Sequence, residues 1–326
     1  MIRIQIEKRE QGSTLRRFLM KKLPKAPVSV FYQALRKNKI KIGTHRPKNL
    51  SEILKEGDEV LLYLTDEQLS GFGYGNPEKS GEDLLRPIPP ALRAMKIPIL
   101  YEDDQLLIVD KPAGIAVQKG SSDPYSLTEK MLEYLGISAE ENQSSYRPSF
   151  CHRIDKNTRG LLIMAKTLQA HHAVDYLIKN RLIHKYYLAI VEGVPKKWED
   201  ETTLIHGYRK DRKTNQARLT FAVESLPEGY VLCESRVRLI RSEGGLSLVR
   251  VELITGKSHQ IRAQLSFEGY PILHDGKYGS GFSYRQMLLS YELFFEEAPS
   301  PIEYMKGQRI RAALPDAFSS LIKAKQ

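Results

Sequence analysis

The stretch Cys151-His-Arg-Ile-Asp-Lys-Asn-Thr-Arg-Gly160 runs directly into the apolar segment Gly160-Leu-Leu-Ile-Met-Ala165. The apolar segment predicts a buried strand. Before it, one carboxylate, Asp155, stands among four basic side chains, which are His152, Arg153, Lys156 and Arg159. Such surroundings keep a carboxylate ionised and attract an anionic backbone, as a nucleophile acting on a nucleic-acid sugar requires. An ordinary salt-bridged loop is the alternative interpretation.

The sequence from Leu100 onward predicts more strands and hairpins than helices. Apolar runs predict strands at 106–109, 185–191, 235–240 and 246–254, and Glu243-Gly-Gly245 is typical of a hairpin turn. Helical spacing is found at 126–135, 168–178 and 258–267. Strands and helices do not alternate regularly, so the predicted fold class is α+β with a largely antiparallel mixed sheet.

The first 64 residues predict a small basic α/β domain. They contain 15 Lys and Arg against 6 Asp and Glu, a net charge of +9, out of +11 for the 326-residue chain. Apolar spacing predicts one helix from Leu15 to Leu23 and a second that begins at a Ser29 cap. Short strands are expected at 1–7, 39–42 and 60–64. Because the positive charge is concentrated there, a polyanionic partner is favoured over a merely solvated face.

Composition excludes several protein classes. The chain is 41% hydrophobic and 27% charged, which is typical of a globular protein. No apolar run is long enough to span a membrane, and the alternating N-terminus is not a signal peptide. The two cysteines cannot form a disulfide framework, so we expect a protein of the reducing cytoplasm.

Motifs for nucleotides, cofactors and metals are incomplete. Thr255-Gly-Lys-Ser258 resembles the end of a phosphate-binding P-loop, but Val251 occupies the position of its first glycine. Gly71-Phe-Gly73 lacks the third glycine of a dinucleotide fingerprint, because Asn76 stands there. No spacing of Cys and His suits zinc. We therefore expect no cofactor, no nucleotide and no metal.

Four ordered motifs resemble those of the RluA family of pseudouridine synthases. His152-Arg-Ile-Asp-Lys-Asn-Thr-Arg-Gly-Leu-Leu-Ile-Met-Ala-Lys166 is similar to the family's catalytic H-R-L-D-x-x-T-S-G-L-L-x-x-A-K motif. The other matching blocks are Val109-Asp-Lys-Pro-Ala-Gly114, Lys185-Tyr-Tyr187, and Thr255-Gly-Lys-Ser-His-Gln-Ile-Arg262 with Pro271-Ile-Leu-His-Asp-Gly-Lys-Tyr-Gly279. The resemblance implies an enzyme that isomerises RNA uridine to pseudouridine with a catalytic domain at residues 99–326.

The resemblance assigns roles to three residues. Asp155 would be the catalytic aspartate that starts cleavage of the uridine N1–C1′ bond, after which the uracil turns and rejoins through C5. Tyr187 would pack against the base and help to remove the C5 proton, while Tyr186 would face the other side of its strand. Arg262 would pair with Asp155 and hold the carboxylate ionised and oriented. Without the family resemblance, the sequence would favour a core aromatic residue at Tyr187 and a residue on the surface of a helix at Arg262.

The N-terminal segment resembles the S4 RNA-binding domain. Its Leu15-Arg-Arg-Phe-Leu19, Leu35-Arg-Lys-Asn-Lys-Ile-Lys-Ile-Gly43 and Leu54-Lys-Glu-Gly-Asp-Glu-Val60 passages carry the likeness, which sets the boundaries of this domain at residues 1–64. Residues 65–98, rich in Gly and Pro, are predicted to be a linker. The expected RNA contacts are His152, Arg153, Thr158, Arg159, Lys111, Lys257, His259, Gln260, Arg16, Arg17, Arg36, Lys37 and Lys39.

Two departures from the family pattern lie near the expected RNA path. Arg159 replaces a usual Ser and Lys257 a usual Arg, so altered RNA binding is expected more than a loss of catalysis. The block Leu289-Ser-Tyr-Glu-Leu-Phe-Phe295 replaces the family's L-H-A-x-x-L-x-F, which weakens any transfer of substrate specificity.

The favoured partner is RNA, with 23S ribosomal RNA or pre-50S particles as the expected substrate, because family members with an S4 domain mostly act on the large subunit. The alternatives are a tRNA or multi-substrate synthase, a catalytically silent RNA-binding or ribosome assembly factor, and a metal-dependent nuclease. The nuclease lacks the carboxylate cluster that two-metal cleavage requires. No membrane contact is expected, and a monomer is favoured.

Overall fold

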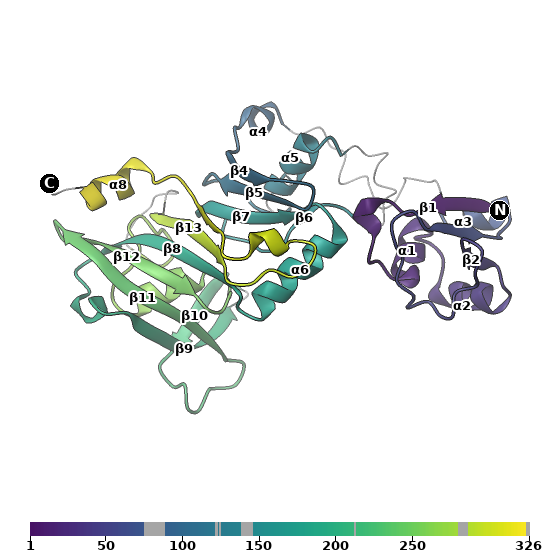
Figure 1. Ribbon diagram of the computed structural model, residues 1–326. Coiled ribbons are helices and arrows are strands. Elements are labelled where there is room, and N and C mark those ends of the chain that lie inside the picture. The colour runs from purple at the N-terminus through teal and green to yellow at the C-terminus, as the bar shows by residue number, and fades with distance from the viewer. Residues whose placement is uncertain are drawn as a thin grey trace.

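Figure 1 shows the computed structural model of the chain as a small N-terminal unit beside a large β-sheet. The structure describes residues 1–74, 89–120, 123, 125–137, 146–211, 213–279 and 286–323. Within these ranges no helix is long and apolar enough to cross a membrane. Cys151 and Cys233 are both free thiols.

The N-terminal unit, residues 1–74, packs helices on a three-stranded antiparallel sheet of order β1-β3-β2. Its strands are β1 (Ile2–Gln5), β2 (Ile40–Ile42) and β3 (Glu59–Leu62). Its helices are the short 3-10 helix η1 (Lys8–Glu10), α1 (Leu15–Lys22), α2 (Val28–Arg36) and α3 (Asp66–Gly71). Phe18, Leu19 and Phe31 lie in its core, with at most 1% of their surfaces exposed.

The helices of this unit follow the predicted apolar spacing, with one difference at a cap. The Thr14 side chain accepts a hydrogen bond from the Arg17 amide and begins α1. The prediction that Ser29 caps the second helix is wrong, because α2 begins at Val28 and Pro27 occupies the cap position. Proline fits there because its fixed φ suits a helix start and its missing N–H would have no intrahelical partner.

The large unit is built on an eleven-stranded sheet. Its main order is β10-β9-β11-β12-β8-β13-β7-β5-β4, with β14 on β13 and β6 on β7. The strands are β4 (Ile99–Glu102), β5 (Leu106–Lys111), β6 (Ser149–Phe150), β7 (Arg159–Ala165), β8 (Ile183–Glu192), β9 (Thr202–Asp211), β10 (Gln216–Thr220), β11 (Val231–Glu243), β12 (Leu246–Leu253), β13 (Leu288–Phe295) and β14 (Arg309–Arg311). Every pairing is antiparallel except β13 with β7. The predicted α+β class with a largely antiparallel mixed sheet is confirmed.

Helices cover both faces of this sheet. They are α4 (Pro90–Ala94), α5 (Leu127–Tyr134), α6 (Leu168–Lys179), α7 (Gln260–Phe267) and α8 (Asp316–Lys323), with the 3-10 helices η4 (Lys196–Trp198) and η5 (Glu303–Met305). In β7, Leu162 and Met164 join one buried cluster while Leu161 and Ile163 join another. Successive side chains of a strand point to opposite faces, so both faces of the sheet are core. This explains the continuous apolar run of β7.

The segment predicted to be a linker contains a short helix at each end. Leu69 of α3 packs in the core of the N-terminal unit, and Leu92 of α4 packs in a core cluster of the large unit. Residues 75–88 between them lie outside the described part of the chain. The linker and the boundary at residue 64 remain predictions.

Candidate active site

Asp155 lies in the loop that connects β6 to β7. The loop turns on itself, because the Thr158 amide donates to the Asp155 carbonyl at 3.1 Å. It is tied to a second loop, since the Gly114 amide donates to the Lys156 carbonyl at 2.9 Å. With its backbone held in this way, the Asp155 side chain is 26% exposed and faces a cavity.

Arg262 connects Asp155 to a second carboxylate. Its Nη1 donates to Asp155 Oδ2 at 2.9 Å. Its Nε and Nη2 donate to Asp275 Oδ2 and Oδ1 at 2.7 and 2.8 Å, a bidentate pair. Asp275 is fully buried and also accepts the backbone amides of Lys277 and Tyr278. The predicted pairing of Arg262 with Asp155 is therefore present, and Asp275 fixes the guanidinium from behind.

The charges in this cluster are unequally satisfied. Burial alone would lower the pKa of Arg262, but the hydrogen bonds and charges of Asp275 and Asp155 raise it. One guanidinium cation thus faces two carboxylates, and Asp275 receives two of its three hydrogen bonds. The remaining negative charge belongs to Asp155, which is the carboxylate that faces the cavity.

His259 completes this side of the site. Its Nδ1 lies 3.0 Å from the Tyr278 hydroxyl, and its Nε2 lies 4.0 Å from Asp155 Oδ2. Burial is the main cause that lowers the pKa of His259 to about 4; the charge of Asp155 opposes this shift, and the charge of Arg262 adds to it. His259 is therefore a neutral imidazole at pH 7.

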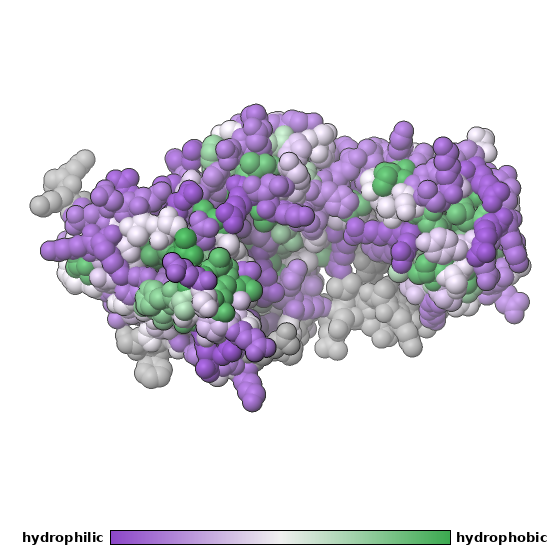
Figure 2. All heavy atoms as spheres, turned by 90° about the horizontal axis from the view of Figure 1, so that it is seen from below, coloured by the Kyte–Doolittle hydropathy of each residue, from purple (hydrophilic) through white to green (hydrophobic). Residues whose placement is uncertain are grey.

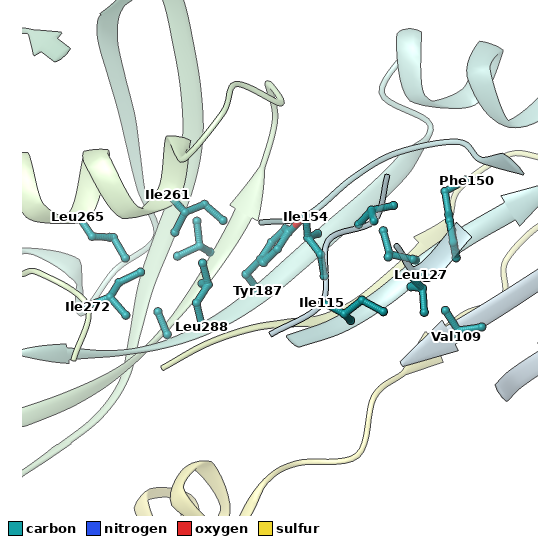
Figure 3. Packing of buried hydrophobic residues seen from close by; sticks show 14 of the residues in the cluster. Val109, Ile115, Leu127, Phe150, Ile154, Tyr187, Ile261, Leu265, Ile272 and Leu288 are labelled. Carbon is teal, nitrogen blue, oxygen red and sulfur yellow. The ribbon is translucent and has the colours of Figure 1, made fainter. Parts of the chain in front are cut away.

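Tyr187 lies on β8 beside the same cavity. Figure 3 shows it next to Ile154 in the buried apolar cluster, and only 4% of its surface is exposed. Burial raises its pKa to about 12, with a smaller contribution from the charge of Asp155, although a hydrogen bond with Ser290 opposes the shift. Tyr187 is thus both a core aromatic and part of the cavity wall. Tyr186 instead packs against Arg250, whose Cζ lies 3.8 Å from the centre of the tyrosine ring. Neighbouring residues of a strand point to opposite faces, so this agrees with the expectation that Tyr186 faces away from the site.

The cavity at Asp155 has a volume of about 950 Å³. Tyr187 forms part of its wall, and Arg153, Lys257 and Lys277 supply positive charge. Ligand sites reach roughly 1,000 Å³ in proteins, so an extruded nucleotide and part of its backbone can enter. The arrangement offers an anionic oxygen, an apolar wall and cations that would neutralise phosphate.

Four of the predicted RNA contacts have their polar atoms engaged within the protein. Lys111 is fully buried and its Nζ donates to the carbonyls of Pro112, Ile115 and Lys156, each at 2.9 Å. Lys111 therefore ties loops together and does not reach RNA, which corrects the prediction. Burial lowers its pKa to about 7, with Asp155 and Asp110 acting in the opposite direction.

The other three of these residues also make hydrogen bonds within the protein. Thr158 is 2% exposed and its hydroxyl accepts from Gln286 Nε2 at 2.6 Å. Gln260 is 2% exposed, and its Nε2 donates a hydrogen bond to the Glu234 carbonyl at 2.9 Å. His152 Nε2 accepts the Ile163 amide at 3.2 Å. In this structure the buried Thr158 and Gln260 side chains shape the loops around Asp155, which corrects the prediction that they contact RNA directly. His152 is half-buried and also lines the cavity, so its contact with RNA stays a prediction.

The remaining predicted contacts lie in three places. Arg153 and Lys257 are exposed and line the cavity, and the half-buried His259 lines it as well. Arg159 pairs with the buried Asp110 at 2.9 Å while part of its side chain stays exposed. The others lie on the N-terminal unit and are exposed or half-buried, namely Arg16, Arg17, Arg36, Lys37 and Lys39.

Asp275 and Tyr278 are site residues that sequence reasoning did not single out. Both stand in the block Pro271-Ile-Leu-His-Asp-Gly-Lys-Tyr-Gly279, which matches the family pattern without giving either residue a role. The position of the acid Asp275 in a block that begins with Pro and ends with Gly could have marked it as a candidate site residue. Among the described residues, no group of three or more His, Cys, Asp or Glu could hold a metal ion.

Comparison with known proteins gives consistent results. A family model described as RNA pseudouridylate synthase matches residues 105–267. An uncharacterized RNA pseudouridine synthase of Mycoplasma capricolum is 28% identical, over 95% of this chain and 97% of its own. Ribosomal large subunit pseudouridine synthase C of Vibrio cholerae is 29% identical, over 85% of this chain and 80% of its own. Human RNA pseudouridylate synthase domain containing 4 superposes with a TM-score of 0.51 at 22% identity, over 69% of this chain and 91% of its own, so it shares the fold.

Proposed function

Because this chain belongs to the RNA pseudouridylate synthase family, we propose that it isomerises uridines of large-subunit ribosomal RNA and that Asp155 is its catalytic carboxylate. The observation that carries the assignment of Asp155 is the hydrogen-bonded chain from Asp275 through Arg262 to Asp155 at the cavity. Of the two carboxylates in this hydrogen-bonded chain, Asp155 is the one that lines the cavity in which a nucleotide would lie.

The reaction is an isomerisation. The N1–C1′ bond of uridine breaks, a C5–C1′ bond forms, the C5 proton leaves and N1 regains a proton. Substrate and product have the same composition, so the balance requires no oxidant and no phosphoryl donor. The chain must supply a carboxylate near the sugar, a cavity in which the uracil can turn, and a grip on the RNA.

Arg262 supports this chemistry by orientation. Its bidentate bond to the buried Asp275 fixes the guanidinium plane, which then fixes Asp155 Oδ2 through the third hydrogen bond. A positioned carboxylate avoids the entropic cost of finding the reactive geometry, which accounts for a large part of many enzymatic rate enhancements. Arginine suits this task because its charge is permanent and its donors are planar.

Tyr187 supports the packing of the base better than the removal of its proton. With a pKa of about 12, its phenol is protonated at pH 7 and is not a ready base. Its ring forms part of the cavity wall beside Ile154, where a uracil could lie against it. We therefore assign to Tyr187 the positioning of the base while the base turns.

The choice of ribosomal RNA rests on a relative and on charge. The Vibrio cholerae relative is named a ribosomal large subunit pseudouridine synthase, and it aligns over 85% of this chain. The N-terminal unit carries most of the excess positive charge. Figure 2 shows that hydrophilic residues dominate the face of the molecule in view. An S4-like module that grips RNA through Arg16, Arg17, Arg36, Lys37 and Lys39 fits these features.

Replacement of the carboxylate tests the catalytic assignment. We expect Asp155→Asn and Asp155→Ala to release no tritium above background from RNA labelled at C5 of uridine, because neither side chain supplies an anionic oxygen. Both variants should bind the same RNA with an affinity within a few-fold of wild type. The control is Asp211→Asn, which changes a half-buried acid that pairs with Arg218 and does not line the cavity. Substantial activity of either Asp155 variant would refute the assignment.

A pseudouridine map tests the substrate. Ribosomal RNA from a deletion strain is compared with RNA from its parent and from a strain complemented with Asp155→Asn. We expect at least one 23S position to lose pseudouridine in both the deletion and the Asp155→Asn strain. Changes confined to tRNA would move the assignment to a tRNA synthase.

A further inference from the structure

A second large cavity lies between the two units, away from Asp155. Its volume is about 810 Å³. Helix α1 of the N-terminal unit forms one wall, and α6 with the segment 146–149 of the large unit forms the other. Residues beside η1 lie against α6, since a Cβ at Gly12 would be 3.2 Å from Gln169 Cγ. We call this cavity the inter-unit groove.

The inter-unit groove is lined with cations. Arg16, Arg17 and Lys21 enter it from α1, and Arg147 enters from the large unit. The acid in its lining is Asp175, which lies 3.3 Å from His171 Nε2. Four full positive charges therefore face one carboxylate that already has a partner.

Arg147 is incompletely satisfied in the groove. Its Nε is buried and has no hydrogen-bond partner among the described residues. Burial lowers the pKa of Arg147, and the charge of Glu129 only partly opposes this. A buried donor without an acceptor is unfavourable, and a bound anion would supply the missing acceptor.

Lys21 is a second cation of the groove whose charged form is disfavoured by its surroundings. Burial lowers its pKa to about 8, and Glu10 opposes this shift, while Lys22, Arg147 and Arg17 add to it. The neighbouring cations of the groove therefore add a smaller lowering of the pKa to the larger one that burial causes. An anion bound among these side chains would favour the charged form of Lys21.

The groove adjoins the catalytic cavity along two elements. On α6, Asp175 lines the groove and Ile178 lines the cavity at Asp155, and residues three apart lie on the same face of a helix. In the segment before the catalytic loop, Ser149 lines the groove and His152 lines the cavity. The groove and the catalytic cavity therefore come close to each other along both elements, so one RNA strand is long enough to reach both.

We propose that the inter-unit groove binds the phosphodiester backbone of the RNA strand that flanks the target uridine. Arg17, Lys21 and Arg147 are its phosphate contacts. The inference rests on the proposed function and deepens it, because it adds to the S4-like contacts a site made jointly by both units. Through this site, bound RNA would hold the N-terminal unit against the large unit.

Binding of a fluorescein-labelled 25-nucleotide oligouridylate to the full-length chain tests this site. We expect Arg147→Ala and Arg17→Ala each to weaken binding about tenfold at low salt, which corresponds to about 1.4 kcal/mol of binding free energy. The slope of log affinity against log salt should flatten by about 0.7 for each phosphate that no longer has its cationic partner. The matched control is Arg238→Ala, which removes an exposed arginine of β11 that lines neither cavity and should keep the wild-type slope.

Two further arms keep the test decisive. Arg147→Lys, which keeps the charge, should retain most of the salt slope, whereas a merely structural role for Arg147 would leave the slope equal in all folded variants and overturn the proposal. Poly-L-glutamate that displaces the RNA as effectively as unlabelled oligouridylate would also overturn the assignment to RNA. The assay measures binding alone, so failure of the Asp155 chemistry would be seen separately, in tritium release.

Discussion

At the scale of single residues, the site depends on one arginine shared between two acids. Asp275 is buried and receives two hydrogen bonds from Arg262, while Asp155 receives one and stays 26% exposed. A buried ion pair adds little net stability, but its loss leaves a charge buried without compensation. Asp275 therefore serves the orientation of Asp155 more than the stability of the fold.

This arrangement predicts the effect of Asp275→Asn. The amide keeps the shape of the side chain, and Arg262 keeps the charge of Asp155, but the buried bidentate pair is lost, which should cost about 1.5 to 3 kcal/mol of unfolding free energy. We also expect kcat to fall more than tenfold with a smaller change in KM, because Asp155 loses its fixed partner. Urea unfolding and single-turnover kinetics measure the two effects.

The pair of Asp211 and Arg218, joined at 2.8 Å with the arginine exposed, provides the matched control for Asp275→Asn. Asp211→Asn removes a carboxylate charge from a pair whose arginine is exposed to solvent, and it should cost less than about 1 kcal/mol. Equal losses of stability and activity in the two variants would contradict the special role of Asp275.

His152 predicts a pH dependence of stability. Burial lowers its pKa to about 3, whereas an unfolded histidine titrates near 6.5. Between these values the unfolded chain binds one proton more than the native chain, so the free energy of unfolding falls as the pH falls. The contribution reaches about 1.4 kcal/mol per pH unit. Protonation would also break the bond that Nε2 accepts from the Ile163 amide.

Denaturant unfolding at pH 7, 6 and 5 checks this expectation. His152→Gln should be less stable than wild type at pH 7 but should lose less stability as the pH falls. Burial also lowers the pKa of His206, which contributes in the same direction in both proteins, so the difference between them isolates His152. Parallel pH profiles for wild type and His152→Gln would rule out the assignment.

At the scale of elements, the parallel contact between β7 and β13 depends on a glycine. Gly160 has a φ of +121° and pairs with Ser290. A Cβ on Gly160 would lie 2.2 Å from the Ser290 carbonyl oxygen. This close approach places the first residues of β7 against β13. The loop that carries Asp155 directly precedes these residues, so it is held there as well.

Gly160→Ala is therefore expected to destabilise the protein by more than about 3 kcal/mol, because it combines backbone strain with a clash against backbone atoms. The midpoint of urea unfolding measures this loss. Gly71→Ala is the control, since Gly71 ends α3 and a Cβ there would meet nothing within 4 Å. Similar midpoints of urea unfolding for the two variants would show that the close approach of β7 to β13 does not contribute to stability.

The elements also show what a sequence can predict. Helix α1 and strand β7 follow from local apolar periodicity, so their predicted ranges agree with the structure to within one or two residues. Helix α3 was predicted to be linker, because a single buried Leu69 gives no periodic signal. Lys111 was predicted to contact RNA, since nothing local in its sequence reports the three carbonyls that surround its ammonium group.

The same limit applies to the candidate site. The Asp155 motif is contiguous and could be recognised, whereas its partners come from α7 and the loop after it, more than a hundred residues later. Pairing of Arg262 with Asp155 was predicted only through family resemblance. The division of Arg262 between two acids depends on tertiary packing that no local pattern encodes.

At the scale of the whole molecule, charge and chemistry lie on different units. Residues 1–64 carry +9 of the net charge, and the other 262 residues carry +2. The candidate catalytic groups, Asp155, Arg262 and Tyr187, belong to the large unit. Binding of RNA through the N-terminal unit should therefore change affinity without changing the geometry at Asp155.

The triple substitution of Arg36, Lys37 and Lys39 by Gln tests this separation in the full chain. These cations lie at the end of α2, away from both large cavities. If all three contact phosphate, the salt slope for single-stranded RNA should flatten by about 2, since each contact contributes about 0.7. The rate at saturating RNA should change little, because the cluster around Asp155 is untouched.

A control with the same change in charge separates direct phosphate binding from net charge. Lys196, Arg238 and Lys306 are exposed cations of the large unit that line neither large cavity. Their replacement by Gln lowers the net charge equally, but it should leave the salt slope near the wild-type value, because screened charges far from the RNA release few counterions. Equal flattening in both triple variants would mean that RNA responds to overall charge, and the N-terminal unit would then lose its assignment as the RNA-binding module.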